Sequence, residues 1–140
     1  MRWITREQVK VDRVACPWLI CRFVDPDAEF LFVAADQVAA KAKALDAIPC
    51  DIDGCEFGHH GEDVSFNSIL KKYHLTDPAL VLLGEIDRAA DDHPLQPHPA
   101  GEGLRWVAFG FGALGLSDRE ILERESVVYD ALYAECRRRV

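Results

Sequence analysis

The amino-acid sequence predicts one helix-rich domain of the α+β or α/β class, in which about six helices cover a small central sheet. The chain has 140 residues, the size of a single ordinary domain, and we expect residues 1–140 to form one domain. Hydrophobic residues make up 49% and charged residues 29%, a composition that predicts a packed core and excludes extensive disorder. Few stretches are typical of strands, and the second half of the chain is mostly typical of helices.

Two stretches in the first half are typical of strands, and the segment between them is typical of a helix. Residues 2–5 suit a short strand, and the aromatic and apolar run Glu29–Val33 suits a central strand. Residues 15–24 are mostly apolar, and Pro17 stands where a helix would begin. We therefore expect a buried helix that starts near Cys16.

The segment after the second strand predicts another helix and then irregular structure. Asp36 is expected to cap an Ala/Lys-rich helix that runs to about residue 47. Residues 48–57 look irregular, with two short strands around Asp53 and Gly54.

Four helices are expected in the second half of the chain, and they cover residues 65–74, 78–90, 104–116 and 118–139. Ser117 and Glu120 have the spacing of a capping box, which marks the start of the last helix. Residues 92–103 hold three prolines and predict a surface loop.

The overall charge and the cysteines exclude several classes of function. The sequence carries 24 acidic residues against 16 Lys and Arg, a formal charge of −8. Direct nucleic-acid binding is not expected, because it needs the opposite balance. No apolar run approaches the roughly 20 residues that cross a bilayer, and the N-terminus lacks the apolar stretch of a secretory signal.

Five cysteines without C-x-x-C spacing predict free thiols in a reducing cytoplasm, with a redox switch or a metal thiolate as alternatives.

The richest group of candidate metal ligands lies between residues 50 and 63, where nine of 14 residues are Asp, Glu, His or Cys. Glycines in this segment allow tight bends that bring several side chains together. Glu56 and His59 have the spacing of a carboxylate–imidazole metal pair, and such donors suit a divalent first-row metal, namely Zn, Mn or Fe. The simpler alternative is an acidic turn in which His59 is hydrogen-bonded to a carboxylate.

Other acidic residues are candidates to complete this metal site. Glu29 or Asp91 would supply a further carboxylate to Glu56 and His59. Asp91 lies with Arg88 at the end of a predicted helix, so a helix-end ion pair is the simpler alternative. The second ring nitrogen of His59 would be oriented by one of three neighbouring acids, Asp51, Asp53 or Glu62.

The N-terminal segment is basic and predicts a site for a small anionic ligand. Residues 1–24 carry five basic residues against two acidic ones, a local charge of +3. Asp12, Arg13 and Arg22 are the candidate anion-binding or substrate-binding residues, since they flank a predicted helix start and arginines can fork onto an oxyanion. Alternatively, Asp12 caps the helix and the arginines pair with surface acids. Cys16 would be either a reactive thiol or a core residue.

A series of short motifs runs through nearly the whole chain. It begins with Val-Asp-Arg-Val-Ala-Cys-Pro-Trp-Leu-Ile at residues 11–20 and continues through residues 25–33, 56–59, 88–91 and 128–133. Together these motifs resemble the ChrB-type chromate resistance domain, in its stand-alone form. The resemblance implies a role in bacterial chromate resistance, where such domains occur alone or as the C-terminal part of a chromate-responsive regulator. Family members often carry Arg at the position of His60, a difference that leaves His59 unaffected.

Two hypotheses about function follow. The first is a cytoplasmic metal-binding domain, or small metal-dependent enzyme, that takes an anionic ligand beside the metal. The second is a non-catalytic sensor that binds chromate or similar oxyanions and signals to a partner. A third idea is chromate reduction through the thiol of Cys16. The sequence leaves the reaction, the metal and the oligomeric state open.

Overall fold

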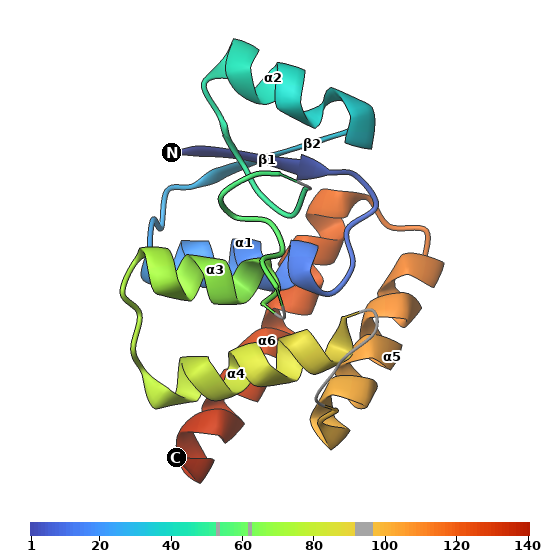
Figure 1. The fold of residues 1–140 in the computed structure, drawn as a ribbon. Coiled ribbons are helices and arrows are strands. Elements are labelled where there is room, and N and C mark those ends of the chain that lie inside the picture. Colours follow the sequence, from blue (N-terminus) through green and yellow to red (C-terminus); the bar gives the residue numbers. More distant parts are fainter. Residues whose placement is uncertain (53, 62, 92–96) are drawn as a thin grey trace.

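Three short parallel strands form a sheet with helices on both faces (Figure 1). β1 (Arg2–Arg6) is the middle strand, between β2 (Glu29–Val33) and β3 (Ile48–Pro49). The architecture is helix-rich α/β, as the sequence predicts. The computed structural model describes residues 1–52, 54–61, 63–91 and 97–140.

Alternate side chains of β1 face two different cores. Ile4 packs with Val38 and Ala42 of α2 (Val38–Leu45), on one face of the sheet. Trp3 belongs to the main core on the other face. Because successive side chains of a strand point to opposite faces, this short strand connects both cores.

The strand Glu29–Val33 lies at the edge of the sheet, so the prediction of a central strand there is wrong. Only Phe30 of this strand is buried, whereas Trp3, Ile4 and Thr5 of β1 are all buried. The apolar character of Glu29–Val33 reflects packing of its side chains, which an edge strand also needs, and says little about its position in the sheet.

The two connections between strands cross opposite faces of the sheet. α1 (Asp12–Phe23) joins β1 to β2, and the 3₁₀ helix η1 (Ala35–Gln37) and α2 join β2 to β3 (Figure 1). α1 starts at Asp12 and not near Cys16, because the residues before Pro17 already form its first turn. Asp36 lies inside η1 and its side chain caps no helix, so that prediction is also wrong.

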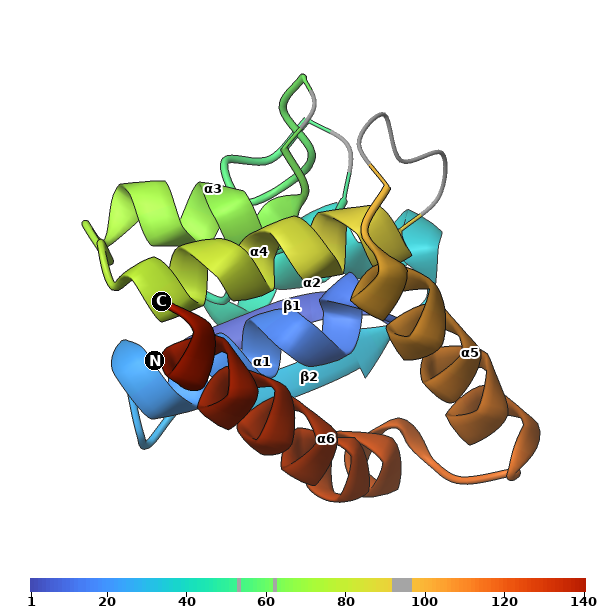
Figure 2. The same ribbon diagram turned by 90° about the horizontal axis from the view of Figure 1, so that it is seen from below.

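Four more helices lie on the face of the sheet that carries α1, and they are α3 (Ser65–Lys72), α4 (Pro78–Ala90), α5 (Pro99–Ala113) and α6 (Asp118–Arg139). α1 packs against α3, α4 and α6 and so lies between these helices and the sheet (Figure 2). The main core is therefore built around α1, whose residues from 14 to 20 are all buried. No helix in the described part of the chain is long and apolar enough to cross a membrane.

The helix starts in the second half follow local capping signals. Ser117 Oγ accepts a hydrogen bond from the N–H of Glu120, whose carboxylate accepts from the N–H of Ser117, which confirms the capping box. α5 begins at Pro99, earlier than predicted, because His98 Nδ1 accepts from the N–H of Ala100 and proline is favoured at the first helical position. Part of the predicted surface loop is thus helical, and residues 92–96 lie outside the described residues.

Candidate metal and anion site

The candidate site lies beyond the carboxyl ends of β1 and β3. β1 ends at Arg6 and leads into the first residues of α1, while β3 leads into Asp51. In the sheet, β2 pairs with one side of β1 and β3 pairs with the other side. The order in which the chain adds strands therefore changes direction between β1 and β3. In open α/β sheets, ligands bind in the crevice at such a reversal. The topology therefore points to the same place as the titratable residues described below.

Asp12 is buried at the start of α1, where its carboxylate caps a different helix. It accepts hydrogen bonds from the backbone N–H groups of Ser65, at 2.7 Å, and Phe66, at 3.2 Å, which open α3. The Cys16 thiol donates to the same carboxylate at 3.4 Å. The predicted alternative, a cap on α1 itself, is thus replaced by a contact between two helices that are far apart in the sequence.

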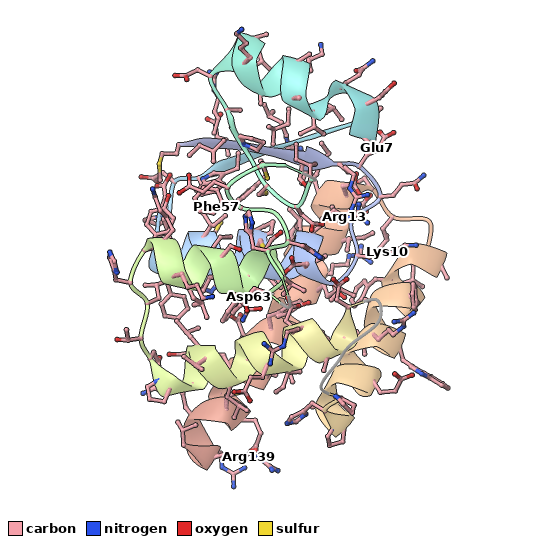
Figure 3. The ribbon with its side chains drawn as sticks, in the orientation of Figure 1. Glu7, Lys10, Arg13, Phe57, Asp63 and Arg139 are labelled. Carbon is pink, nitrogen blue, oxygen red and sulfur yellow. The ribbon has the colours of Figure 1, made fainter. Side chains whose placement is uncertain are left out.

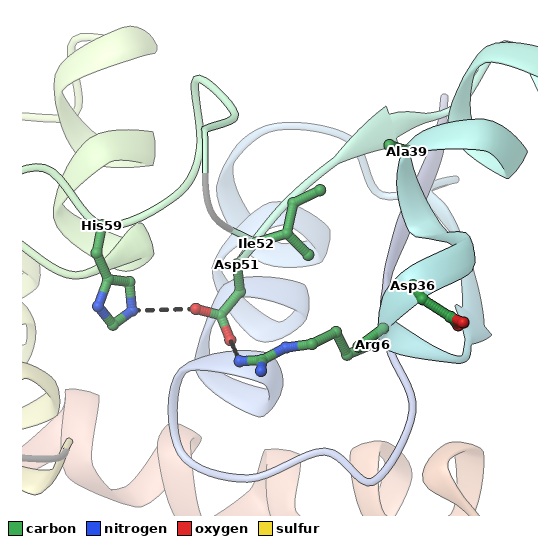
Figure 4. A pocket seen from close by; sticks show the side chains of 7 residues that line it. Arg6, Asp36, Ala39, Asp51, Ile52 and His59 are labelled. Atoms are coloured by element: carbon green, nitrogen blue, oxygen red, sulfur yellow. Dashed lines mark hydrogen bonds and ion pairs between the residues drawn. The ribbon is translucent and has the colours of Figure 1, made fainter.

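Asp51 has a buried carboxylate that joins the basic and acidic parts of the site. Its Oδ1 atom accepts a hydrogen bond from Ser65 Oγ at 3.2 Å and lies 3.0 Å from Nε2 of His59. Its Oδ2 atom lies 3.6 Å from Arg13 Nε and 3.7 Å from Arg6 Nη2. Figure 4 shows the ring of His59 and the guanidinium of Arg6 on opposite sides of this carboxylate.

His59 presents one ring nitrogen to three carboxylates. Its Nε2 atom lies 3.0 Å from Asp51 Oδ1, 3.5 Å from Asp91 Oδ2 and 3.6 Å from Asp12 Oδ2. Hydrogen bonds to Asp12 and Asp51 raise the pKa of His59 to about 10, although its side chain is 45% exposed. Without a metal, the ring is therefore an imidazolium at neutral pH. We call these four residues the Asp/His cluster.

A fourth acidic group, Asp87, is fully buried behind Asp12. Burial and the nearby Asp12 carboxylate raise the pKa of Asp87 well above its usual range, so it is a neutral acid. Burial alone would raise the pKa of Asp12, but the neighbouring His59 and Asp87 side chains outweigh it and lower that pKa. Neither carboxyl oxygen of Asp87 has a hydrogen-bond partner among the described residues, so no donor stabilises a charged form of this group.

One residue of the cluster and one residue next to it have positive φ angles. Val11, directly before Asp12, has φ 41° and ψ −104°, a conformation that β-branched residues rarely adopt. The hydroxyl of Tyr129 donates a buried hydrogen bond of 3.1 Å to the Val11 carbonyl. Asp51 is also left-handed, with φ 53°. Strain of this kind persists where the surrounding structure enforces it, and it concentrates at functional sites.

The donor set of the cluster fits a divalent metal ion. The ligand atoms of Asp12, Asp51 and His59 all lie within 4.8 Å of one another. Since ligand bonds are about 2 Å long, atoms that share one ion lie up to about 4 Å apart, so small side-chain shifts bring this set onto one ion. Two carboxylates and an imidazole are ligands typical of Zn, Mn and Fe, and Asp91 is close enough to add a third carboxylate.

Three basic residues lie beside the cluster. Arg6, Lys10 and Arg13 line a hollow of about 330 Å³ together with all four residues of the Asp/His cluster. Figure 3 shows Lys10 between Arg13 and α5. Burial, and then the charge of Arg6, lowers the pKa of Arg13, and an anion placed between the two guanidinium groups would relieve this repulsion. We call this cavity the first hollow.

The structure brings together four of the seven predicted site residues, namely Asp12, Arg13, His59 and Asp91. The other three have partners elsewhere. Arg22 forms a two-pronged ion pair with Asp130. Glu29 is 70% exposed and pairs with Arg2, and Glu56 is 60% exposed and pairs with Lys72.

Sequence reasoning missed the roles of three residues in this site, Arg6, Ser65 and Asp51. The sequence predicts Asp51 only as a group that orients His59, and the other two candidates for that role, Asp53 and Glu62, lie outside the described residues. Arg6 is the last residue of β1 and Asp51 follows two residues after β3, and these positions identify them once the strand order is known.

The structure places the Cys16 thiol in the core, where it donates a hydrogen bond to Asp12. All five cysteines are free. Burial, followed by the charge of Asp12, raises the pKa of Cys16 well above its usual range, so the thiol stays protonated. This opposes the hypothesis of a reactive Cys16 and favours the alternative of a core residue.

The comparisons with known proteins agree with the resemblance in the motifs. Residues 3–136 match the family model described as "ChrB, C-terminal domain". The chain is 35% identical over 133 residues to Protein ChrB of Cupriavidus metallidurans, and the match covers 94% of this chain and 40% of that protein. The chain thus spans about 40% of the length of the curated relative it matches. No solved structure matches the chain significantly. From residue 3 to residue 136, this chain belongs to the family of ChrB C-terminal domains.

Proposed function

We propose that this domain binds a divalent first-row metal ion through Asp12, Asp51 and His59, and an anionic ligand beside it. The observation that carries the proposal is the convergence of three carboxylate oxygens within 3.6 Å of one imidazole nitrogen. Three carboxylates face one imidazolium on this side of the cluster, and oxygen ligands of this kind attract a divalent cation. Metal binding replaces the ring proton, since only neutral imidazole is a ligand.

The adjacent arginines support the second half of the proposal. The Nε atoms of Arg6 and Arg13 are buried, and within the described residues neither has an acceptor at hydrogen-bond distance. Buried donors of this kind are costly unless a ligand satisfies them. An anion on these groups would lie on the open side of the metal ion, next to Asp51. A metal ion and two arginines on either side of an anionic substrate would bind it and polarise its oxygen atoms. A small metal-dependent enzyme uses groups of this kind.

The family resemblance supports a role in chromate resistance, and the free thiols support a reducing cytoplasm as the site of action. A second candidate is a non-catalytic oxyanion sensor, which the paired arginines favour because guanidinium groups bind tetrahedral oxyanions without a metal. The two candidates differ in whether the anion needs the metal ion.

Metal titration of the purified protein tests the proposal. Elemental analysis after purification without added metal, followed by calorimetric titration with Zn²⁺ and Mn²⁺, should give one site per chain. Asp51→Asn should weaken binding at least about tenfold, since it removes a ligand charge. Glu56→Gln is the matched control, because its carboxylate pairs with Lys72 and should leave the affinity unchanged. A wild-type protein that never binds metal contradicts the proposal. Saturable sulfate binding by the metal-free protein would favour the sensor.

A further inference from the structure

A second hollow continues from the first one toward the start of α6. Its volume is about 580 Å³, and it is lined by the segment from Glu7 to Lys10, by Phe109 and Gly112 of α5, and by Leu116, Ser117, Asp118 and Ile121. Lys10 and Phe109 line both hollows. The charged first hollow and the second hollow therefore meet at this pair of side chains.

The residues at the junction offer a surface for an apolar group. The ring of Phe109 is flanked by two cations, with Lys10 Nζ 5.3 Å and the Arg105 guanidinium 5.2 Å from its centroid. Phe109 is nevertheless 44% exposed. Beyond it, Leu116 and Ile121 contribute apolar surface to the second hollow, and Glu7, Gln8, Ser117 and Asp118 contribute polar groups. Exposed aromatic surface next to a charged pocket is typical of small-ligand sites.

An inorganic oxyanion uses only part of this arrangement. It would occupy the first hollow, on Arg6 and Arg13, and would leave Phe109 and the whole second hollow without a role. A ligand with an anionic head and an apolar body uses both. Its head would pair with the arginines beside the metal ion, and its body would cross the Lys10–Phe109 pair and lie against α5 toward Gly112.

We propose that the ligand of this domain is an organic anion, whose acidic head binds in the first hollow and whose apolar body binds in the second. The inference rests on the anion site proposed above and adds the class of ligand. Burial of a phenyl-sized group against Phe109 and Leu116 strengthens binding relative to the head alone, because apolar surface leaves water.

Two glycines of α5 provide a matched pair of variants. A Cβ atom added at Gly112 or at Gly110 meets nothing within 4 Å, so both positions have open space for a side chain. Gly112 lines the second hollow, whereas Gly110 lines neither of the two hollows. Gly112→Leu therefore places a side chain at the wall of the second hollow, and Gly110→Leu makes the same chemical change outside it. Both substitutions also favour the helix equally.

The experiment compares methylphosphonate with phenylphosphonate, which share one anionic head, by calorimetry on the metal-loaded protein. We expect phenylphosphonate to bind at least about tenfold more tightly to the wild type and to Gly110→Leu. In Gly112→Leu this preference should disappear, while methylphosphonate affinity stays unchanged. Equal affinities in the wild type, or a preference that survives in Gly112→Leu, overturn the inference and leave the proposed metal and anion site standing. Metal binding without binding of either phosphonate overturns the proposed anion site and this inference together.

Discussion

The Nε2 atom of His59 lies 3.0 Å from Oδ1 of Asp51, and Oδ2 of the same carboxylate faces the guanidinium groups of Arg6 and Arg13 at 3.7 and 3.6 Å. One buried carboxylate therefore stands between the Asp/His cluster and these arginines. A metal ion bound by Oδ1 and an anion bound by the arginines would be separated by little more than this group. Any ligand that bridges the metal and the arginines must pass beside Asp51.

His59→Gln should abolish tight metal binding. Glutamine can still donate a hydrogen bond to Asp51, so the fold is retained, but it is a poor ligand for a first-row metal. We expect the affinity for Zn²⁺ to fall at least about 100-fold, measured by calorimetric titration. His60→Gln is the matched control, because the His60 ring contacts the Glu56 carbonyl and is exposed. Full metal stoichiometry in His59→Gln would show that the site has been misassigned.

Asp12→Asn should destabilise the protein as well as weaken the metal site. The Asp12 carboxylate accepts from two N–H groups at the start of α3, and an amide has only one oxygen for both. We expect the free energy of unfolding in urea to fall by about 1–3 kcal/mol.

Asp118→Asn separates this stability effect from metal binding. The Asp118 carboxylate accepts from the N–H groups of Gln8 and Val9 in the same manner, outside the Asp/His cluster. Asp118→Asn should lose stability and keep its metal affinity. If both variants lose metal equally, then stability and not ligation explains the loss.

Local signals in the sequence predict most helices and half of the site. The starts of α4 and α6 follow from Pro78 and from the capping box at Ser117, because these signals act within one turn. Asp91 comes directly after α4, and its Oδ2 atom lies 3.5 Å from Nε2 of His59. The position of β2 at the edge depends on pairing between distant segments, which no local pattern specifies.

The spacing of Glu56 and His59 illustrates what a motif cannot predict. Residues three apart share a face only on a helix. Here both lie in the irregular segment between β3 and α3, so their side chains diverge, and Glu56 pairs with Lys72 while His59 turns to Asp51. The true partner of His59 is eight residues away in the sequence, and it is brought back by a left-handed turn at Asp51 itself.

Arg13 and Arg22 should differ in their effect on anion binding, although the sequence suggests the same role for both. Arg22 is bound to Asp130 on an exposed surface, so Arg22→Ala should change stability by less than about 1 kcal/mol and leave sulfate affinity unchanged. Arg13→Ala should weaken sulfate binding at least about tenfold and spare the metal. Sulfate titration of both variants measures this. Equal losses in the two would place the anion elsewhere.

Cys16 and Cys50 should resist alkylation in the folded protein. Both are buried, and burial raises the pKa of each thiol, so neither forms the thiolate that reacts. Iodoacetamide followed by mass mapping should modify these two residues only after unfolding in urea. Cys16→Ser should leave any chromate-reducing activity of the protein unchanged, and a loss of that activity would revive the thiol mechanism.

The stability of the domain should fall as pH rises, because of Glu125. This side chain is fully buried in α6, and burial raises its pKa from 4.5 to about 7. The folded protein therefore keeps a proton that the unfolded chain releases, and stability is lost between about pH 4.5 and pH 7.

Glu125→Gln removes this loss. We expect its free energy of unfolding to match that of the wild type near pH 4 and to exceed it by about 3 kcal/mol near pH 8. Urea unfolding at both pH values measures the difference. The exposed Glu123→Gln is the control, and a Glu125→Gln stability curve that runs parallel to the wild-type curve would show that Glu125 does not carry this proton in the fold.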